Sequence, residues 1–274
     1  MIQSIERISL TAADAATLAR FYIEAIGFRE TGRQRIEAAA YGVDGQALAV
    51  SLVLGQQEIE LVQFDRAGAP YPADASSHDP IFQHIALVTT DIRSALARLT
   101  AGMRMISKDA PVALPASSGG VTAAKFRDPE GHPLEFLQFP KASAPDQWRG
   151  VAMPDHPCIG IDHSALVATD TLRSIRFYSE RGLSVTARTI NTGPEQDRLD
   201  GVQGAEVEVT ALSPAGPTPH VELLRYRSPM AATTAAAADA DVAATRLIVR
   251  TAACNSKIMI SDPDGHRMVL LPAS

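Results

Sequence analysis

Cysteine, long apolar runs and positive charge are all scarce in this sequence. Only two cysteines, Cys158 and Cys254, are present, too few for a disulfide framework and too far apart for a cysteine zinc knuckle. No uninterrupted apolar run reaches the roughly 18 residues of a transmembrane helix. Residues 1–7 have neither the basic nor the apolar region of a signal peptide. These absences predict a soluble, cytoplasmic protein with reduced thiols and no membrane partner.

The charge balance argues against nucleic acid as a partner. The formal net charge is -6 and the pI is about 5.6, so binding to a phosphate backbone would lack its main driving force. The 274 residues are 46% hydrophobic and 20% charged, which is typical of a globular protein. A prior of about 150 residues per domain suggests two domains.

Internal repetition is the most informative feature that the sequence does contain. A strand-like run that begins with Arg or His reaches an aspartate seven residues later, three times along the chain. This pattern is typical of a β-strand that leads into a helix with the aspartate as its N-cap. The copies recur after about 70 to 80 residues, which is too long for a solenoid repeat and indicates duplicated modules. The copies run from Arg7 to Asp14, from His84 to Asp91 and from His163 to Asp170.

A second repeated motif closes two of the units. Residues 128–132 read Asp-Pro-Glu-Gly-His, and residues 262–266 read Asp-Pro-Asp-Gly-His. Proline and glycine at these positions favour a tight turn between two strands. We expect His132 and His266 to brace these turns rather than to bind a ligand.

Each complete unit is expected to have the element order β-α-β-β-β. Helices are expected at 14–25, 91–101 and 171–181, and their aromatic residues are expected in the core. The fourth unit is eroded and lacks a helix and most of a strand. Long polar loops at 107–120 and 191–201 could close over a binding site. We predict an N-terminal domain, 1–140, with modules 1–65 and 80–140, a linker, 141–158, and a C-terminal domain, 159–274, with modules 159–228 and 244–272.

Four such units, with a histidine on the first strand, a glutamate on the last strand and the Asp-Pro-x-Gly-His turn, resemble the vicinal oxygen chelate superfamily. Its members include glyoxalase I, methylmalonyl-CoA epimerase, extradiol dioxygenases and bleomycin-resistance proteins. The resemblance extends from about residue 4 to residue 272. It implies an α+β fold in which pairs of units curl into incomplete, cup-shaped β-barrels, with metal ligands on the first and last strand of each unit.

Carried over to this chain, those ligand positions are kept in units two and three and lost in part in the other two. The implied metal ligands are His84, Glu135, His163 and Glu222, whereas the matching positions hold Arg7 and Glu60 in unit one and Arg246 and Val269 in unit four. Two imidazoles and two carboxylates suit one divalent ion such as Zn, Ni, Co, Fe or Mn.

The pairing of the units decides whether these ligands can meet. If units one and two share a cup, and three and four another, neither cup has a complete ligand set. If units two and three pair, one cup holds all four ligands. We favour the second arrangement, because unpaired buried carboxylates are costly and chance loss would not leave all intact ligands in two adjacent units.

Three further residues are candidates for the substrate pocket. His220 and Tyr226 alternate onto the same face of their strand as Glu222, and Arg198 lies in the polar loop 191–201. Ordinary packing explains His220 and Tyr226 equally well, and a solvated loop residue is the simpler interpretation of Arg198.

The resemblance implies a divalent-metal-dependent enzyme of glyoxalase I or epimerase type. It would abstract a proton next to a metal-chelated carbonyl, with Glu135 or Glu222 as the base. An Fe(II) extradiol-type dioxygenase is one alternative, and a metal-free small-molecule binding protein of the bleomycin-resistance type is another. The expected substrate is a small molecule with adjacent oxygens, and the protein would be a monomer or a homodimer.

Overall fold

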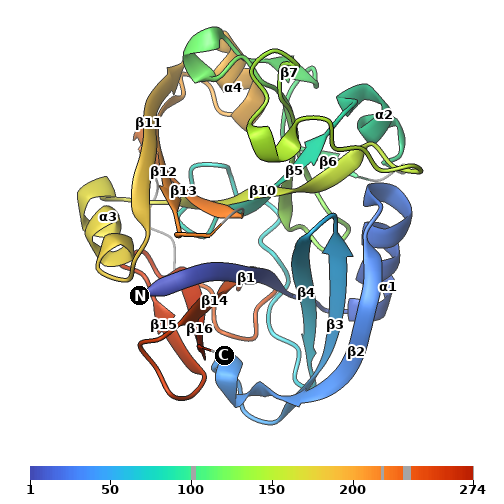
Figure 1. Ribbon diagram of the computed structural model, residues 1–274, viewed down its shortest axis with the longest axis vertical. Coiled ribbons are helices and arrows are strands. Elements are labelled where there is room, and N and C mark those ends of the chain that lie inside the picture. Colours follow the sequence, from blue (N-terminus) through green and yellow to red (C-terminus); the bar gives the residue numbers. More distant parts are fainter. Residues whose placement is uncertain (100–102, 217–218, 231–235, 274) are drawn as a thin grey trace.

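The structure is a computed structural model that describes residues 1–99, 103–216, 219–230 and 236–273. It confirms the predicted α+β fold of four repeated units, with the fourth eroded (Figure 1). Units one and four hold β1 (Ile2–Thr11), α1 (Ala15–Phe21), the π-helical turn η1 (Tyr22–Ile26), β2 (Arg29–Glu37), η2 (Ala38–Tyr41), β3 (Gln46–Leu54), β4 (Gln57–Phe64), β14 (Arg246–Thr251), β15 (Ile258–Ser261) and β16 (Arg267–Pro272). Unit two holds β5 (Gln83–Thr89), α2 (Ile92–Ala97), β6 (Arg104–Met105), β7 (Val112–Ala113), η3 (Ala116–Ser118), β8 (Thr122–Arg127) and β9 (Pro133–Gln138). After η4 (Asp146–Trp148), unit three holds β10 (Cys158–Val167), α3 (Thr171–Ser179), β11 (Ser184–Thr192), α4 (Pro194–Asp200), β12 (Glu206–Ser213) and β13 (His220–Ser228).

The strands form two open, cup-like sheets, and each sheet combines strands from both halves of the chain. One sheet has the order β15-β16-β14-β1-β4-β3-β2, and the other has β11-β12-β13-β10-β5-β9-β8-β6 with β7 paired to β8. Units two and three therefore share a sheet, as we favoured, and units one and four share the other, in the lower half of Figure 1. The division into two domains, 1–140 and 159–274, stays a prediction. Each sheet takes strands from both of these segments.

The repeated aspartates start the helices as the sequence predicts. Asp14 and Asp91 each accept two backbone N–H bonds in the first helical turn, and Asp170 accepts one. These bonds satisfy N–H groups that have no partner within the helix. The helix of unit one continues through η1 and ends at Gly27, whose φ of 100° is a left-handed conformation that favours glycine. The expected helix 91–101 ends in the structure as α2 at Ala97, and residues 100–101 lie outside the described part of the chain.

The two repeated turns connect the sheets to each other. The hydroxyl group of Tyr22 on the first helix donates to Asp128 of the first turn at 3.0 Å, and Tyr178 donates to Asp262 of the second turn at the same distance. Both tyrosines are buried in a continuous apolar core that includes residues of both sheets. The prediction that the aromatic residues of these helices belong to the core is thereby confirmed.

The segment 191–201 was expected to be a loop, and this was wrong. Residues Pro194–Asp200 form α4. Proline in the first turn is pre-organised for a helix, and the acidic residues Glu195 and Asp197 suit the positive end of its dipole. Among the described residues, no helix is long and apolar enough to cross a membrane.

Candidate metal centre

The pairing of β5 with β10 arranges units two and three symmetrically around one point. In this antiparallel pair, His84 lies opposite Ala165 and His163 lies opposite Ala86. The same two alanines lie opposite Glu222 on β13 and Glu135 on β9, respectively. Because side chains alternate along a strand, residues two apart share a face of the sheet. The four predicted ligands therefore come from four adjacent strands and one face.

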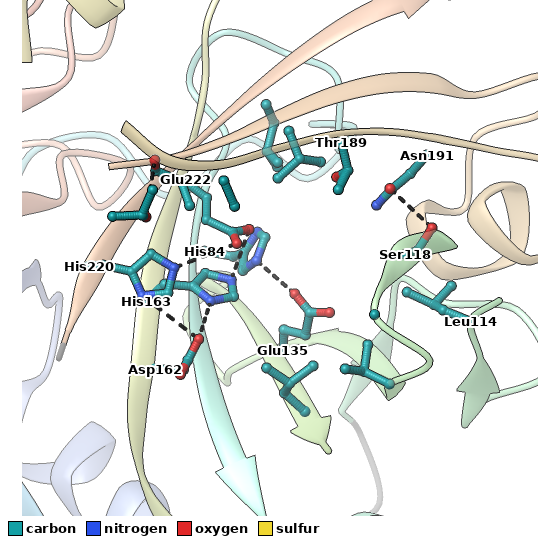
Figure 2. A pocket seen from close by; sticks show the side chains of 18 of the residues that line it. His84, Leu114, Ser118, Glu135, Asp162, His163, Thr189, Asn191, His220 and Glu222 are labelled. Atoms are coloured by element: carbon teal, nitrogen blue, oxygen red, sulfur yellow. Dashed lines mark hydrogen bonds and ion pairs between the residues drawn. The ribbon is translucent and has the colours of Figure 1, made fainter. Parts of the chain in front are cut away.

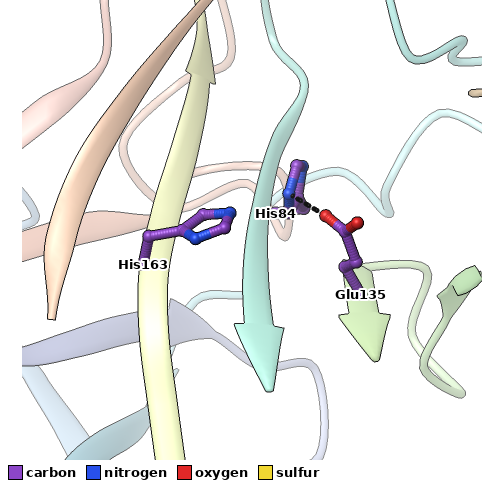
Figure 3. Close-up of side chains that lie close together, drawn as sticks. All are labelled: His84, Glu135 and His163. Carbon is purple, nitrogen blue, oxygen red and sulfur yellow. Dashed lines mark ion pairs between the residues drawn. The ribbon is translucent and has the colours of Figure 1, made fainter. Parts of the chain in front are cut away.

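These four side chains surround a single cavity of about 690 Å³ (Figure 2). His84 Nε2 lies 2.8 Å from a carboxylate oxygen of Glu135, and His163 Nε2 lies 3.4 Å from one of Glu222. The centroids of the two imidazole rings are 5.7 Å apart. His84, Glu135 and His163 each offer one ligand atom, and these atoms lie within 4.8 Å of one another. Figure 3 shows the three side chains, which come from three neighbouring strands.

Both carboxylates of the site, those of Glu135 and Glu222, are ionised at neutral pH. Burial alone would raise the pKa of Glu135, but the ammonium group of Lys125 and the neighbouring His84 lower it to about 2. Burial also opposes ionisation of Glu222, and His163 and His220 lower its pKa to about 2.

The two histidines differ in their electrostatic environment. Burial lowers the pKa of His84, and the positive charge of Lys125 lowers it further. For His163, burial acts in the same direction, but Glu222 and Asp162 outweigh it and raise the pKa to about 9. His84 is therefore neutral at pH 7, which is the form that binds a metal, whereas His163 must lose a proton first.

The donors present fit a divalent ion. Both ring nitrogens of His84 are buried and have no hydrogen-bond partner in the described part of the protein, although Glu135 lies close to Nε2. A buried polar atom without a partner costs about 1–3 kcal/mol, and a metal ion on Nε2 would remove part of that cost. Two imidazoles and two carboxylates form a mixed N/O set suited to Zn, Ni, Co, Fe or Mn.

The three predicted pocket residues lie in different places. His220 lines the cavity, with its Nε2 3.6 Å from a carboxylate oxygen of Glu222. The residues that line the cavity do not include Tyr226, whose hydroxyl group donates to Asp200 at 2.8 Å, or Arg198, which pairs with Glu195 at 3.4 Å. Of the three, the structure places only His220 at the cavity.

The predicted closing segments do meet at the cavity. Ser118 donates to the side chain of Asn191 at 3.0 Å, which joins η3 of unit two to the end of β11 in unit three. Gln196 of α4 also lines the cavity. The polar segments 107–120 and 191–201 therefore form part of its wall.

A buried charge cluster beside Glu135 was missed from the sequence. Lys125 on β8 lies directly opposite Glu135 on β9, and its ammonium nitrogen lies 2.6 Å from the carboxylate of Asp200 on α4. Asp200 also accepts hydrogen bonds from Gln196 and Tyr226. The turn 128–132 fixes the register of β8 against β9, so the opposition of Lys125 and Glu135 could have been read from the sequence.

Substituting Lys125→Met is expected to lower the free energy of unfolding by about 3 kcal/mol, because it leaves Asp200 buried without its cation. Urea unfolding measures the loss. In the double variant Lys125→Met/Asp200→Asn neither member of this ion pair is charged, and we expect at least half of the stability to return. A double variant no more stable than the single one would show that this ion pair does not account for the loss.

In the other sheet, residues at positions equivalent to the proposed ligands form a different network of ion pairs and hydrogen bonds. Arg7 lies 3.3 Å from Glu60, which also accepts a hydrogen bond from Tyr41 at 2.7 Å. The side chain of Arg246 is fully buried and donates to Thr11 and to backbone carbonyl groups. Guanidinium groups thus occupy the positions that histidines hold in the first sheet, and they balance the retained carboxylate of Glu60.

Comparison with known proteins assigns the chain to a family. A model described as the Glyoxalase/Bleomycin resistance protein/Dioxygenase superfamily matches residues 4–136. Virulence protein STM3117 of Salmonella typhimurium is 30% identical over 141 residues, which cover 51% of this chain and 86% of that protein. The chain belongs to the glyoxalase, bleomycin resistance protein and dioxygenase superfamily.

Solved structures show the same fold over nearly the whole chain. Glyoxalase I from Zea mays has a TM-score of 0.60 at 13% identity, covering 98% of this chain and 92% of that one. A putative dioxygenase from Bacillus subtilis has a TM-score of 0.54 at 11% identity, covering 98% of this chain and 84% of that one. At such low identities the likeness concerns the fold alone.

Proposed function

We propose that this protein is a divalent-metal-dependent enzyme of glyoxalase I or epimerase type, which abstracts a proton next to a carbonyl group of a small molecule. The observation that carries the proposal is the arrangement of His84, Glu135, His163 and Glu222 around one cavity. The metal would be Zn, Ni, Co, Fe or Mn, held by these four side chains.

The bound ion would act as a Lewis acid that polarises two adjacent oxygens of the substrate. The base would be one of the two glutamates, and both are ionised at neutral pH. Glu222 is the better candidate. Glu135 lies opposite the permanent cation of Lys125, which opposes uptake of a proton. Glu222 lies 3.6 Å from Nε2 of His220, an imidazole outside the proposed ligand set that can share a proton with it.

The cavity wall indicates a substrate with an apolar body. Leucine, valine, alanine and phenylalanine side chains line much of it, and the basic residues that reach it are paired: Lys125 with Asp200, and Arg188 with Glu208. A cavity of 690 Å³ is within the usual size range of small-molecule sites. We therefore expect an uncharged or weakly charged group attached to the two adjacent oxygens.

Hydrogen–deuterium exchange tests the reaction class without knowledge of the product. Protein loaded separately with Zn, Ni, Co, Fe or Mn is mixed in D2O with α-hydroxy and α-oxo carbonyl compounds that carry apolar substituents, and the C–H signal is followed by ¹H NMR. The proposal predicts exchange that requires the metal and falls by at least about 100-fold in Glu222→Gln. Metal-dependent exchange that persists in both Glu222→Gln and Glu135→Gln would rule out a glutamate base.

A dioxygenase is a second candidate, and one observation favours it. Asp162, His163 and His220 also gather close enough to hold an ion, and two histidines with one carboxylate are the ligand set of non-haem Fe(II) oxygenases. Oxygen consumption by the Fe(II)-loaded protein with catechols would support the dioxygenase function.

A protein that retains less than about 0.1 equivalent of metal would instead favour the metal-free binding function.

All four proposed ligands belong to one chain, so a monomer contains a complete site. We propose a small-molecule substrate and no nucleic-acid or membrane partner. The cytoplasmic location, and the choice between monomer and homodimer, stay predictions from the sequence.

A further inference from the structure

Asp162 faces the same side of the sheet as its neighbour His163, which is unusual for adjacent residues in a strand. The pairing of β10 with β5 shifts register between Ile161 and His163. Such a bulge inserts one extra residue and redirects side chains. Here the extra residue is Asp162, and its carboxylate lies beside the imidazole of His163 instead of on the opposite face (Figure 2).

The carboxylate of Asp162 is buried and both of its oxygens have partners. One oxygen accepts a hydrogen bond from Nδ1 of His163 at 3.0 Å, and the other accepts one from the indole nitrogen of Trp148 at 2.7 Å. An ionised carboxylate can only accept hydrogen bonds, so Nδ1 of His163 must carry the proton. Nε2 is then the nitrogen left to face Glu222 and the cavity.

Trp148 is fixed firmly enough to hold Asp162. It lies in η4, within the segment that joins the two halves of the chain, and packs against Val88 and Ile159. Its ring covers Gly160 so closely that a Cβ atom there would lie 2.6 Å from it. The connecting segment thus reaches Asp162 through this side chain.

The symmetry-related histidine has no such support. The residue before His84 is Gln83, whose side-chain amide donates to the hydroxyl group of Ser164 at 3.0 Å. Nδ1 of His84 is buried without a hydrogen-bond partner in the described residues. His84 and His163 therefore occupy equivalent positions in the candidate site, but only His163 has a carboxylate on its Nδ1 that fixes the orientation of the ring.

We propose that Asp162 is a positioning residue of the metal centre, held by Trp148, which sets the orientation of His163 as a ligand. This inference rests on the proposed metal-dependent function. Carboxylates that accept the second N–H of a ligand histidine fix its ring and raise its basicity, and their loss costs about 10- to 100-fold in metal affinity. Trp148 is the only tryptophan in the sequence, so its fluorescence should report on metal binding.

The test measures Co(II) and Zn(II) affinity by chelator competition, Trp148 fluorescence during the titration, and the visible spectrum of the Co(II) protein. We expect Asp162→Asn to bind each metal about 10- to 100-fold more weakly with an altered Co(II) spectrum. Trp148→Phe should weaken binding by about threefold, the effect of one lost hydrogen bond acting indirectly. Gln83→Met, at the matching position before His84, should change affinity by less than about twofold.

Asp162→Asn that folds and keeps wild-type affinity and spectrum would overturn the proposal. So would complete loss of metal in Asp162→Asn with full retention in Glu135→Gln, since Asp162 would then be a ligand itself. If Asp162→Asn does not fold, Trp148→Phe decides, and unchanged affinity in that variant rejects the proposal. Wild-type protein that binds neither metal would instead reject the proposed function.

Discussion

His163→Ala is expected to reduce bound metal from about one ion per chain to less than about 0.1. The reason is that the site loses a proposed ligand that lies close both to Glu222 and to the pair of His84 and Glu135. His163 Nε2 lies 3.4 Å from Glu222, and the ring also lies within the group formed with His84 and Glu135. The measurement is elemental analysis of protein purified after growth with Ni, Zn, Fe and Mn.

Arg7→Met provides a matched control for this loss. Arg7 occupies the position of His163 in the other sheet, where it pairs with Glu60. This variant should retain about one ion per chain, because the other sheet contributes no ligand. Retention of metal by His163→Ala, or its loss from a folded Arg7→Met, would place the ion elsewhere.

The second large effect concerns stability rather than metal. His132→Leu is expected to lower the free energy of unfolding by about 3 kcal/mol, because it breaks a buried ion pair. Nδ1 of His132 lies 2.8 Å from Asp128, and Nε2 lies near the carbonyl oxygens of Thr11 and Val242. Since all these partners are acceptors, both ring nitrogens must donate, which requires the charged imidazolium.

This ion pair also predicts a direction for the dependence on pH. Burial opposes the charge of His132, but Asp128 outweighs it and raises the pKa above the usual value. A raised folded-state pKa means that the stabilisation is complete below the unfolded-state pKa of about 6.5 and disappears as the pH rises through the folded-state value. The stability difference between wild type and His132→Leu, from urea unfolding, should therefore shrink at high pH.

His266 supplies the comparison, because it occupies the same place in the second turn. Its Nε2 contacts one carbonyl oxygen, that of Val167, at 2.8 Å. His266→Leu should cost about 1 kcal/mol, as expected for one hydrogen bond. Equal losses in the two variants would show that the ion pair with Asp128 adds nothing.

The fold, and the convergence of the four candidate ligands on one cavity, could be predicted because both depend on repeated features. One histidine on a strand has little meaning, but His84 and His163 at the same distance from a helix-starting aspartate define equivalent places. Glu135 and Glu222 follow from the same equivalence. The pairing of units two and three followed from the cost of leaving such groups unpaired in a protein interior.

Two supporting contacts could not be predicted, those of Asp162 with His163 and of Lys125 with Asp200, because they depend on irregular geometry and on contacts between distant segments. Asp162 reaches His163 only through a bulge in β10. Lys125 and Asp200 are 75 residues apart in sequence and meet because α4 packs beside β8. Arg198 was an attractive candidate as a charged loop residue, but its helix directs it to Glu195.

A crystal structure of metal-loaded protein, with the ion located by anomalous scattering, tests the central claim most directly. The account predicts one ion per chain, with His84, His163, Glu135 and Glu222 as ligands at about 2.0–2.2 Å. An ion bound instead by Asp162 and His220, or in the sheet that contains Arg7 and Arg246, would contradict it.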